Sequence, residues 1–296
     1  MRPRLIALVS GFGWHVEDLQ RASRLVDVQL DALPFPSVVG RVRSGHARIE
    51  AGGIDLTHAD GILVRMMPPG TLEQVVFRMD ALHRLGALGV PVLNPARAVE
   101  VAVDKYLALA QLEAAGLPVP ETWTGESAEE ALAAFDELGR DVVIKPIFGS
   151  EGRGLLRVSD RELARRAFST LERLGSVLYV QKMVRHPGYD LRVFVLGGRV
   201  LGVIRRHAPE GDWRTNIAVG GRAEAFSLER DIEELALQAA TAVGAPLAGV
   251  DLLPDLDRGG LVVVEVNAVP GWRALAQATG VDVASEILTY LKGCKR

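Results

Sequence analysis

The chain contains almost no cysteine, and this scarcity excludes several classes of protein. Its one cysteine is Cys294, close to the C-terminus of the 296 residues. A single thiol can form neither an internal disulfide nor a cysteine cluster for zinc. Because a lack of disulfides is typical of proteins in reducing compartments, we expect a cytoplasmic protein.

Long apolar runs and a surplus of one charge are absent as well. No apolar stretch approaches the roughly 20 residues that span a bilayer, and the run from Leu5 ends before Gly11, too early for a signal peptide. The 34 lysines and arginines nearly balance 37 aspartates and glutamates, which gives no electrostatic reason to bind nucleic acid or anionic lipid. We therefore expect small-molecule or peptide partners, and neither nucleic acid nor a membrane.

The chain does have enough apolar sequence for about two packed units, since 48% of its residues are hydrophobic. Residues 1–94 are predicted to form a small α/β domain. The apolar run at 5–9 is typical of a strand buried on both faces, and Gly11-Phe12-Gly13 breaks it before an amphipathic helix. The predicted elements of this domain are strands at 5–9, 26–30, 61–64 and 90–93 and helices at 16–25 and 71–88.

Residues 95–296 are predicted to form a larger domain with two lobes and antiparallel sheets, so the fold class is α/β overall. Asn94-Pro95 signals the start of one long helix at 96–115, which contains Lys105. A lid subdomain follows at 118–182, with strands at 141–145, 155–158 and 177–181 and helices at 128–138 and 161–174. The C-terminal lobe, residues 183–296, has hairpins at 191–206 and 248–266 and helices at 228–243, 272–278 and 281–291.

A glycine-rich loop follows the strand that ends in Lys145. It carries three glycines and a serine, at Gly149, Ser150, Gly152 and Gly154. Backbone N–H groups in such a loop can form a nest for phosphate, and the lysine adds a point charge. The loop lacks the Gly-Lys-Ser/Thr end of a Walker loop, and it does not open a helix as a dinucleotide fingerprint does. A purely structural turn between strands is the alternative.

Oxygen-bearing side chains share one face of a predicted strand pair near the end of the chain. Glu265 and Asn267 are two residues apart, and Asp251 stands on the strand that should pair with theirs. These oxygens suit a hard cation, and Mg²⁺ takes one or two carboxylates together with waters and substrate phosphates. The alternative is a polar pair at a strand end whose hydrogen bonds are satisfied by loops.

Arginines gather in the hairpin and loop that precede this strand pair. Arg192 lies on the first hairpin strand, Arg205 and Arg206 end the second, and Arg214-Thr215-Asn216 follows in the loop. Planar guanidinium groups suit phosphate oxygens and substrate carboxylates. A single arginine at a strand end is usually solvated or salt-bridged, but the convergence with the carboxylate hairpin favours a functional cluster.

Seven elements in this order resemble the ATP-grasp superfamily, and within it the branch of the ribosomal-protein glutamate ligase RimK. The resemblance covers about residues 90–290. Its elements are the helix with Lys105, the loop after Lys145, Gln181-Lys182-Met183-Val184, Asp190 to Val195, Arg214-Thr215-Asn216, Gly249-Val250-Asp251 and Glu265-Val266-Asn267. The resemblance implies an ATP-grasp fold and a ligase that consumes ATP.

Carried over by position, the resemblance also implies a division of the site. The residues implied to bind ATP are Lys105, Lys145, Gly149, Ser150, Gly152, Gly154, Gln181, Lys182, Met183, Asp190, Arg214, Thr215 and Asn216. Asp251, Glu265 and Asn267 would hold Mg²⁺, with Mn²⁺ as an alternative ion and two ions in the site. Arg206 and Arg214 would act in catalysis. Two departures from the family pattern are Lys182, where an acidic residue is common, and Val269, where serine is common.

In this family a carboxylate attacks the γ-phosphorus of ATP, and an amine then displaces phosphate from the acylphosphate. RimK-like relatives add glutamate to a protein C-terminus, a carrier protein, a deazaflavin or a pterin, and residues 97–106 look most like the pterin-associated members. The resemblance also implies a homo-oligomer. The alternatives are a peptide ligase of the D-alanine type and a nucleotide-binding regulatory protein without turnover.

Two features of the N-terminal domain stand at strand ends that should face the cleft. They are the segment Gly11 to Trp14 and the side chain of Arg65. Both are candidates for contact with the acceptor. The alternatives are that Trp14 belongs to the core and that Arg65 forms a surface ion pair.

Overall fold

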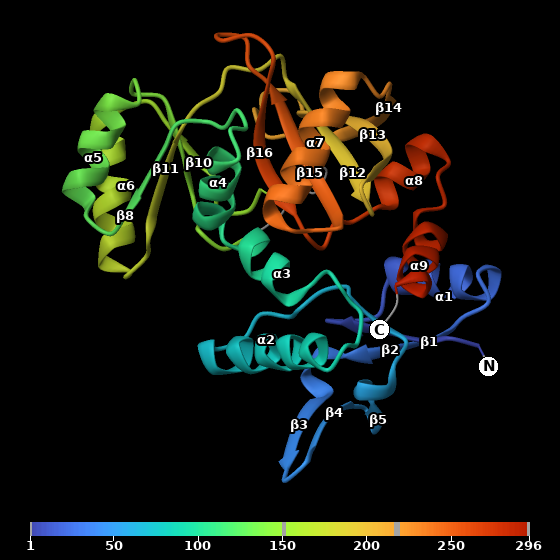
Figure 1. Ribbon diagram of the computed structural model, residues 1–296. Coiled ribbons are helices and arrows are strands. Elements are labelled where there is room, and N and C mark those ends of the chain that lie inside the picture. The colour runs from blue at the N-terminus through green and yellow to red at the C-terminus, as the bar shows by residue number, and fades with distance from the viewer. Residues whose placement is uncertain (1, 150–151, 216–219, 295–296) are drawn as a thin grey trace.

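The computed structural model describes residues 2–149, 152–215 and 220–294. Within these ranges the strands form four sheets. Figure 1 shows a parallel sheet and a small antiparallel one at the base, with two larger antiparallel sheets above them. In the described part, no helix is both long enough and apolar enough to cross a membrane.

The base is a parallel sheet in the order β2-β1-β6-β7. Its strands are β1 (Arg4–Val9), β2 (Gln29–Pro34), β6 (Gly61–Val64) and β7 (Val92–Leu93). Helices α1 (Trp14–Leu25) and α2 (Leu72–Ala87) cover its opposite faces. Alternate residues of β1 pack toward α1 and toward α2, which explains why this strand is apolar throughout.

Most predicted elements of this part are confirmed, and two strands differ in extent. The strand predicted at 26–30 begins only at Gln29, because α1 continues to Leu25 and Asp27 takes a positive φ of 52° that turns the chain. The strand predicted at 90–93 is limited to Val92–Leu93.

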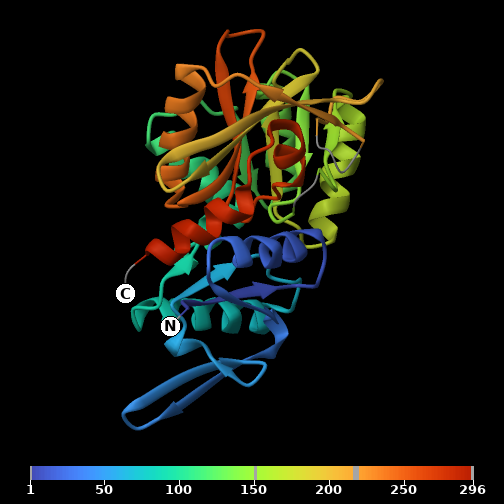
Figure 2. The ribbon, with the colours of Figure 1, turned by 90° about the vertical axis from the view of Figure 1, so that its right-hand side faces the viewer.

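A three-stranded antiparallel sheet between β2 and β6 was not predicted. It consists of β3 (Val38–Arg43), β4 (His46–Ala51) and β5 (Ile54–Asp55), flanked by the 3₁₀ turns η1 (Phe35–Ser37) and η2 (Leu56–His58). The β3–β4 hairpin projects from the base, as Figure 2 shows. Its strands lack a regular apolar alternation because much of the hairpin is exposed, with Val42 91% exposed.

The long helix predicted at 96–115 is wrong, because the structure has two helices there. These are α3 (Ala96–Val103) and α4 (Lys105–Ala114). Asp104 lies between them in an extended conformation, and its carboxylate accepts hydrogen bonds from the backbone N–H groups of Tyr106 and Leu107. This N-cap starts a new helix, so Lys105 occupies the first position of α4 rather than the middle of a longer helix.

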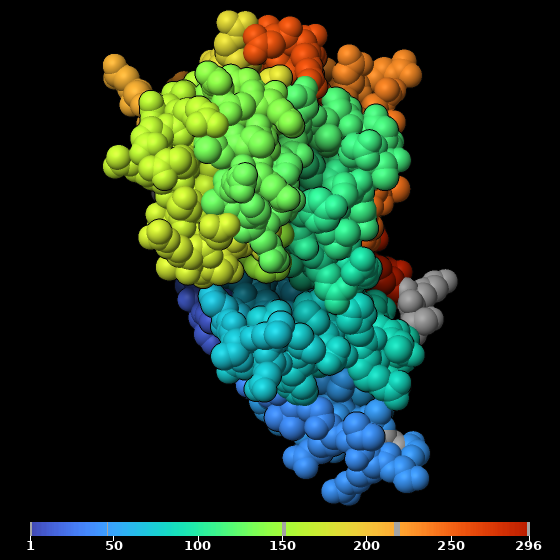
Figure 3. All heavy atoms as spheres, turned by 90° about the vertical axis from the view of Figure 1, so that its left-hand side faces the viewer, coloured from blue at the N-terminus to red at the C-terminus, as the bar shows by residue number. Residues whose placement is uncertain are grey.

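The lid has the predicted alternation of strands and helices. Its sheet has the order β10-β9-β11-β8 and is antiparallel. The elements are β8 (Thr122–Gly125), α5 (Ala128–Glu137), β9 (Val142–Lys145), β10 (Leu156–Val158), α6 (Arg161–Arg173) and β11 (Leu178–Lys182). The helices pack on the sheet through their own apolar core, and Figure 3 shows this unit forming one flank above the base.

The C-terminal lobe is built on a five-stranded antiparallel sheet in the order β14-β13-β12-β15-β16. Both predicted hairpins are present, as β12 (Tyr189–Leu196) with β13 (Arg199–His207) and β15 (Leu247–Pro254) with β16 (Leu261–Asn267). The predicted helices are also present, as α7 (Arg230–Val243), α8 (Arg273–Thr279) and α9 (Val283–Gly293). The edge strand β14 (Arg222–Phe226) was missed.

The base and the C-terminal lobe are joined by more than the chain connection. Helix α9 returns to pack against α1 within one shared apolar core. Asn94 is fully buried, donates to the carbonyls of Leu247 and Ala268 at 2.6 Å each, and accepts from the Leu247 N–H. These contacts hold the parallel sheet against β15 and the residues after β16. The predicted boundaries after residues 94 and 182 stay predictions.

Candidate functional site

One pocket lies where the lid sheet meets the C-terminal sheet, and it brings together most of the predicted site residues. Its cavity volume is about 110 Å³. The predicted residues that line it are Lys105, Lys145, Gly149, Gly152, Gln181, Lys182, Met183, Asp190, Arg214, Thr215, Asp251 and Glu265. Arg206, Asn267 and Gly154 are not among its lining residues, and Ser150 and Asn216 lie outside the described residues.

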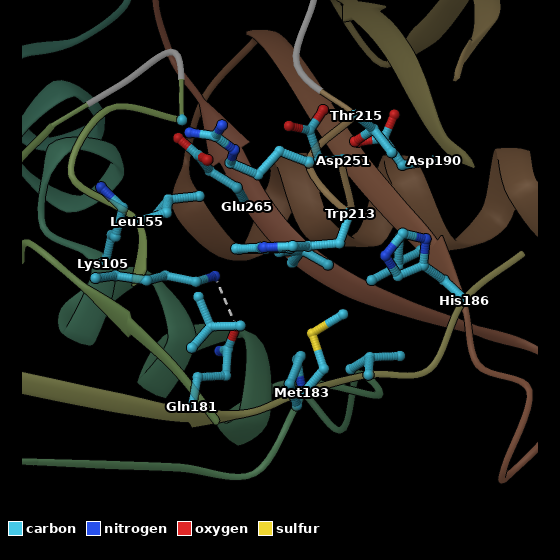
Figure 4. A pocket seen from close by; sticks show the side chains of 18 of the residues that line it. Lys105, Leu155, Gln181, Met183, His186, Asp190, Trp213, Thr215, Asp251 and Glu265 are labelled. Atoms are coloured by element: carbon cyan, nitrogen blue, oxygen red, sulfur yellow. Dashed lines mark hydrogen bonds between the residues drawn. The ribbon is translucent and has the colours of Figure 1, made fainter. Parts of the chain in front are cut away.

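Lys145 enters the pocket at the end of β9, which pairs with β11. Its ammonium group donates to the side-chain oxygen of Gln181 at 2.7 Å, the bond drawn as a dashed line in Figure 4. Gln181 is itself held by a bond from its amide nitrogen to Thr122 at 2.9 Å. Burial lowers the pKa of Lys145 to about 8. The lysine is therefore fixed in position and has few groups to balance its charge until an anion arrives.

Lys105 reaches the same pocket from the start of α4. Its ammonium group donates to the carbonyl of Gly149 at 2.7 Å, and burial lowers its pKa. Gly149 has a φ of 147°, which side chains rarely allow. The lysine thus ties α4 to the glycine-rich loop, and two cationic groups lie beside backbone that can approach phosphate.

Two of the three carboxylates that line the pocket come from directly paired positions on neighbouring strands. Asp251 on β15 pairs directly with Glu265 on β16, so both side chains project from one face of the sheet. Within the described residues Glu265 has no ion pair, and no group of three or more acidic, histidine or cysteine side chains is arranged to hold a metal. Two carboxylates suit Mg²⁺, which completes its coordination with water and phosphate oxygens.

Asp251 is held by two arginines. Arg192 contacts it through both Nε and Nη2, with Nη2 2.8 Å from the carboxylate, and Arg206 Nη2 lies 3.0 Å away. Burial opposes ionisation of Asp251, but the two guanidinium groups outweigh it and keep its pKa below the usual value. Gly249 makes room for this arrangement, since a Cβ there would come within 3.2 Å of Arg192.

Asn267 lies two residues beyond Glu265 on β16 but does not line the pocket. Its side-chain oxygen accepts the backbone N–H of Val269 at 2.8 Å and so stabilises the turn after β16. The predicted third metal ligand is therefore engaged in a local hydrogen bond in this structure. Its assignment as a ligand stays a prediction.

Arg206 lies behind the pocket rather than in it. Only 4% of this residue is exposed, and its guanidinium donates to both oxygens of Asp190, at 2.7 and 2.5 Å. Thr215 donates to the same carboxylate at 2.6 Å. Since Arg206 also contacts Asp251, it links two of the carboxylates that line the pocket. This geometry gives Arg206 a positioning role.

Arg214 lines the pocket directly. Its guanidinium pairs with Asp212 at 2.7 Å, and the same carboxylate accepts the backbone N–H of Arg214. The short segment around Trp213 is therefore held in a defined shape. Arg214 is partly exposed and Arg206 is buried. Of the two predicted catalytic arginines, Arg214 therefore has the more accessible guanidinium group.

Trp213 and His186 are among the pocket residues that were not identified from the sequence. Trp213 reaches across the middle of the pocket, between Glu265 and Gln181 in Figure 4. His186 lines the wall, burial lowers its pKa, and its Nδ1 is buried without a hydrogen-bond partner in the structure. An isolated tryptophan or histidine in a loop carries no periodic signal. Only its position after the strand at 178–182 could have indicated His186.

Comparison with known proteins agrees with this geometry. A match to the family described as RimK-like ATP-grasp domain covers residues 102–291. A tetrahydromethanopterin:alpha-L-glutamate ligase from Methanosarcina acetivorans is 38% identical over 269 residues, which are 82% of this chain and 83% of the relative. A ligase of the same name from Methanococcus maripaludis is 36% identical over 94% of this chain and 96% of its own.

Solved structures have the same fold. The ATP-grasp ligase PsnB complexed with a minimal precursor matches with a TM-score of 0.78 at 20% identity, covering 98% of both chains. A RimK domain protein from Sphaerobacter thermophilus matches with a TM-score of 0.74 at 23% identity, covering 97% of this chain and 98% of its own. At such identities the likeness establishes the fold alone.

The fold and the pocket together define an ATP-dependent carboxylate–amine ligase. The chain belongs to the RimK-like ATP-grasp family. This family uses ATP and Mg²⁺, and a PsnB structure contains Mg and ADP. The predicted family, fold class and class of enzyme are confirmed.

Proposed function

We propose that the protein joins the amino group of L-glutamate to a carboxylate of a small-molecule acceptor, and that the acceptor is a pterin cofactor. The observation that carries this proposal is the likeness to two tetrahydromethanopterin:alpha-L-glutamate ligases. The second of these matches over 94% of the chain, so the likeness includes the parallel sheet at the base as well as the ATP-grasp lobes.

The reaction proceeds in two steps. An acceptor carboxylate oxygen attacks the γ-phosphorus of ATP, the bond from that phosphorus to the bridging oxygen breaks, and ADP leaves with an acylphosphate formed. The glutamate amine then attacks the acyl carbon, phosphate leaves, and the nitrogen loses a proton as the amide forms. Catalysis therefore depends on alignment and on neutralising charge rather than on a covalent protein nucleophile.

The residues of the pocket divide this work. Lys105 and Lys145 neutralise the phosphates, because their buried ammonium groups lie beside the glycine-rich loop. Arg214 offers its fork to the transferred phosphoryl group. Asp251 and Glu265 would hold Mg²⁺, which supplies further positive charge to the phosphoryl oxygens when bound. Use of Mn²⁺, a second ion and a homo-oligomeric assembly are further parts of this proposal.

The test is release of ADP and phosphate by the purified protein with Mg²⁺, measured across amino acids and acceptors. L-glutamate should stimulate release in the presence of a tetrahydromethanopterin-type acceptor, and L-alanine should not. A product larger than the acceptor by one glutamyl residue, seen by mass spectrometry, would complete the assignment.

Other outcomes would redirect the proposal. Stimulation by D-alanine alone would indicate a D-alanine-type peptide ligase. A protein or peptide ending in glutamate that serves as a better acceptor than the pterin would favour a carrier-protein acceptor, as in the name of a 29% identical relative, the glutamate–LysW ligase ArgX of Sulfolobus acidocaldarius. ATP binding without release under any condition would indicate a regulatory nucleotide-binding protein.

A further inference from the structure

The parallel sheet at the base has a point where the chain reverses its direction across the sheet. β1 and β6 are neighbours, but the connection after β1 leads through α1 to β2 on one side, and the connection after β6 leads through α2 to β7 on the other. The two helices lie on opposite faces, so the carboxyl ends of β1 and β6 form a topological switch point, the place at which open α/β sheets bind ligands. Gly11 to Trp14 follow β1, and Arg65 follows β6.

Arg65 is a buried cation without an anionic partner. Only 6% of the residue is exposed, and within the described residues no carboxylate lies within ion-pair distance of its guanidinium. Its Nη1 donates to the Val269 carbonyl at 3.2 Å, and its Cζ lies 4.9 Å from the centre of the Trp272 ring. Its Nε is buried and has no hydrogen-bond partner in the part of the chain that the structure describes. The predicted alternative of a surface ion pair is therefore wrong. A buried, unpaired charge is costly, and burial lowers its pKa only to about 10, which leaves it charged at neutral pH.

The charged and titratable groups near Arg65 and His15 do not form an ion pair with Arg65 within the described residues. Arg273 lies over the Trp14 ring at 5.6 Å. His15 accepts the Trp272 backbone N–H at 3.3 Å, and burial together with nearby Arg65 lowers its pKa to about 4. The nearby carboxylate of Asp18 is already occupied, since it accepts from the Trp272 indole at 2.9 Å and from Arg21.

The start of α1 contributes further backbone donors. Since the N–H groups of Val16 and Glu17 already donate to the Gly13 carbonyl, the donors for a ligand are those of Trp14 and His15. The N-cap of α1 is Gly13, which has no side chain to accept the first-turn N–H groups. A Cβ built at Gly11 or Gly13 would meet no atom within 4 Å, so there is open space beside both residues. Helix N-termini attract anions through free N–H groups and the helix dipole. The switch point thus combines a buried guanidinium that lacks an ion pair among the described residues with backbone donors.

The switch point is connected to the catalytic pocket through β16. Val269, which accepts from Arg65, lies two residues beyond Asn267 and four beyond Glu265. At about 3.3 Å per residue, Asn267 lies roughly 7 Å along the strand from Glu265. The Asn94 contacts fix the base against this segment. One substrate can therefore reach from Arg65 toward the pocket.

We propose that Arg65 and the N-terminus of α1 bind a substrate carboxylate that does not itself react. The proposal rests on the proposed function, because both substrates of a glutamate ligase can carry such a group. L-glutamate has two carboxylates that remain unchanged, and an acceptor can have a second one. A bidentate guanidinium contact would give the carboxylate both affinity and orientation.

The test compares wild type with Arg65→Met and Arg65→Lys, in steady-state assays that vary L-glutamate, acceptor and ATP separately. Arg65→Met should raise the KM for one of the two carboxylate substrates by about tenfold to a hundredfold. This is the loss of affinity that removal of a hydrogen bond to a charged group usually causes. The substrate whose KM rises identifies the source of the carboxylate. The KM for ATP should not change, and Arg65→Lys should recover only part of the loss because it keeps the charge and loses the fork.

A stability measurement separates this role from a structural one. Without substrates, Arg65→Met should not lower the thermal midpoint, because it removes an unpaired buried charge. Arg78→Met is the matched control, since Arg78 is also 6% exposed and donates to the Pro68 carbonyl rather than to a carboxylate. That variant should leave all three KM values unchanged. Equal KM values for Arg65→Met and wild type, or a lower midpoint together with a weaker ATP interaction, would overturn the proposal.

Calorimetry keeps the two proposals distinguishable. If wild type shows no glutamate-dependent ADP release, the proposed function has failed, and direct titration with L-glutamate and with glutarate then tests Arg65. Binding of either probe to wild type that is lost in Arg65→Met would support the carboxylate site by itself. Absence of binding to wild type, or equal binding to both proteins, would overturn it.

Discussion

Asp251 and Glu265 pair directly across β15 and β16, yet their surroundings differ sharply. Asp251 is buried between Arg192 and Arg206, whereas Glu265 has no ion pair among the described residues. Two carboxylates that share one face can both serve a metal ion. Only Asp251 also holds the sheet together, so loss of charge at the two positions should have different consequences.

Glu265→Gln should abolish Mg²⁺-dependent turnover and change stability little, because Glu265 has no ion pair among the described residues and interacts only at longer range with Lys105 and Lys145. Asp251→Asn should abolish turnover and also lower the free energy of unfolding by about 3 kcal/mol, since it leaves buried arginines without their partner. ADP release and urea unfolding, measured on both variants, check this. Near-native activity of either variant at ordinary Mg²⁺ would remove it from the metal site.

The hairpins that carry these carboxylates could be predicted because their signals are local. Alternating apolar residues and the Gly197-Gly198 turn, with φ of 58° and 79°, specify strand pairing within a short stretch of chain. The break at Asp104 could not be predicted in this way. Residues on both sides of it favour a helix, and only the side chain of Asp104 starts the second one.

The long-range contacts of the site left no sequence pattern. Arg206 and Asp190 lie on neighbouring strands, but which carboxylate an arginine binds depends on register and burial that appear only in the folded chain. Trp213 belongs to an irregular segment without periodicity. For these reasons the resemblance could nominate Arg206 as a catalytic residue, while the structure places it behind the pocket.

ATP affinity should fall as the pH rises through about 8. The free protein loses the Lys145 proton near that pH because burial lowers its pKa to about 8, and only the protonated form attracts phosphate. Binding above pH 8 must then take up a proton, so the affinity should fall by at most about tenfold per pH unit. Calorimetry in buffers of different ionisation enthalpy measures this uptake.

Lys145→Arg is the matched control for this pH effect, since arginine does not titrate in this range. Its nucleotide affinity should be nearly constant from pH 7 to pH 9. Lys145→Ala should bind ATP weakly at every pH. An unchanged affinity in Lys145→Ala would remove the lysine from the nucleotide site.

Trp213 should change its environment when nucleotide binds. The pocket volume of about 110 Å³ is well below the roughly 300–1,000 Å³ of small-molecule sites, and Trp213 occupies its middle. Trp213 also borders an adjoining cavity of about 600 Å³, so we expect the indole to move when ATP enters. Tryptophan emission should shift on titration with ATP, and Trp213→Phe should lose that shift. Trp123 lies in the lid strand β8 and outside the pocket, so Trp123→Phe should keep the emission shift. A full shift in Trp213→Phe would contradict this account.

Replacement by lysine should have different effects at the two predicted catalytic arginines, Arg214 and Arg206. Arg214 lines the pocket, so Arg214→Lys keeps the charge but loses the fork, and the rate should fall much more than ATP affinity. Arginines that act on phosphoryl groups contribute on the order of a thousandfold or more in rate. Arg206→Lys should instead lower the thermal midpoint, affinity and rate together, because one ammonium cannot bridge Asp190 and Asp251.

The measurements are single-turnover ADP formation with the cognate carboxylate, nucleotide affinity by calorimetry, and thermal midpoints for both variants. Arg205→Lys is the matched control on the same strand, because Arg205 stacks on Tyr189 and Phe226 and does not line the pocket. Its rate should stay near wild type. If rate and affinity fall equally in Arg214→Lys, this arginine only binds ATP. The charge on the phosphoryl group during its transfer must then be neutralised by Lys105, Lys145 and the metal.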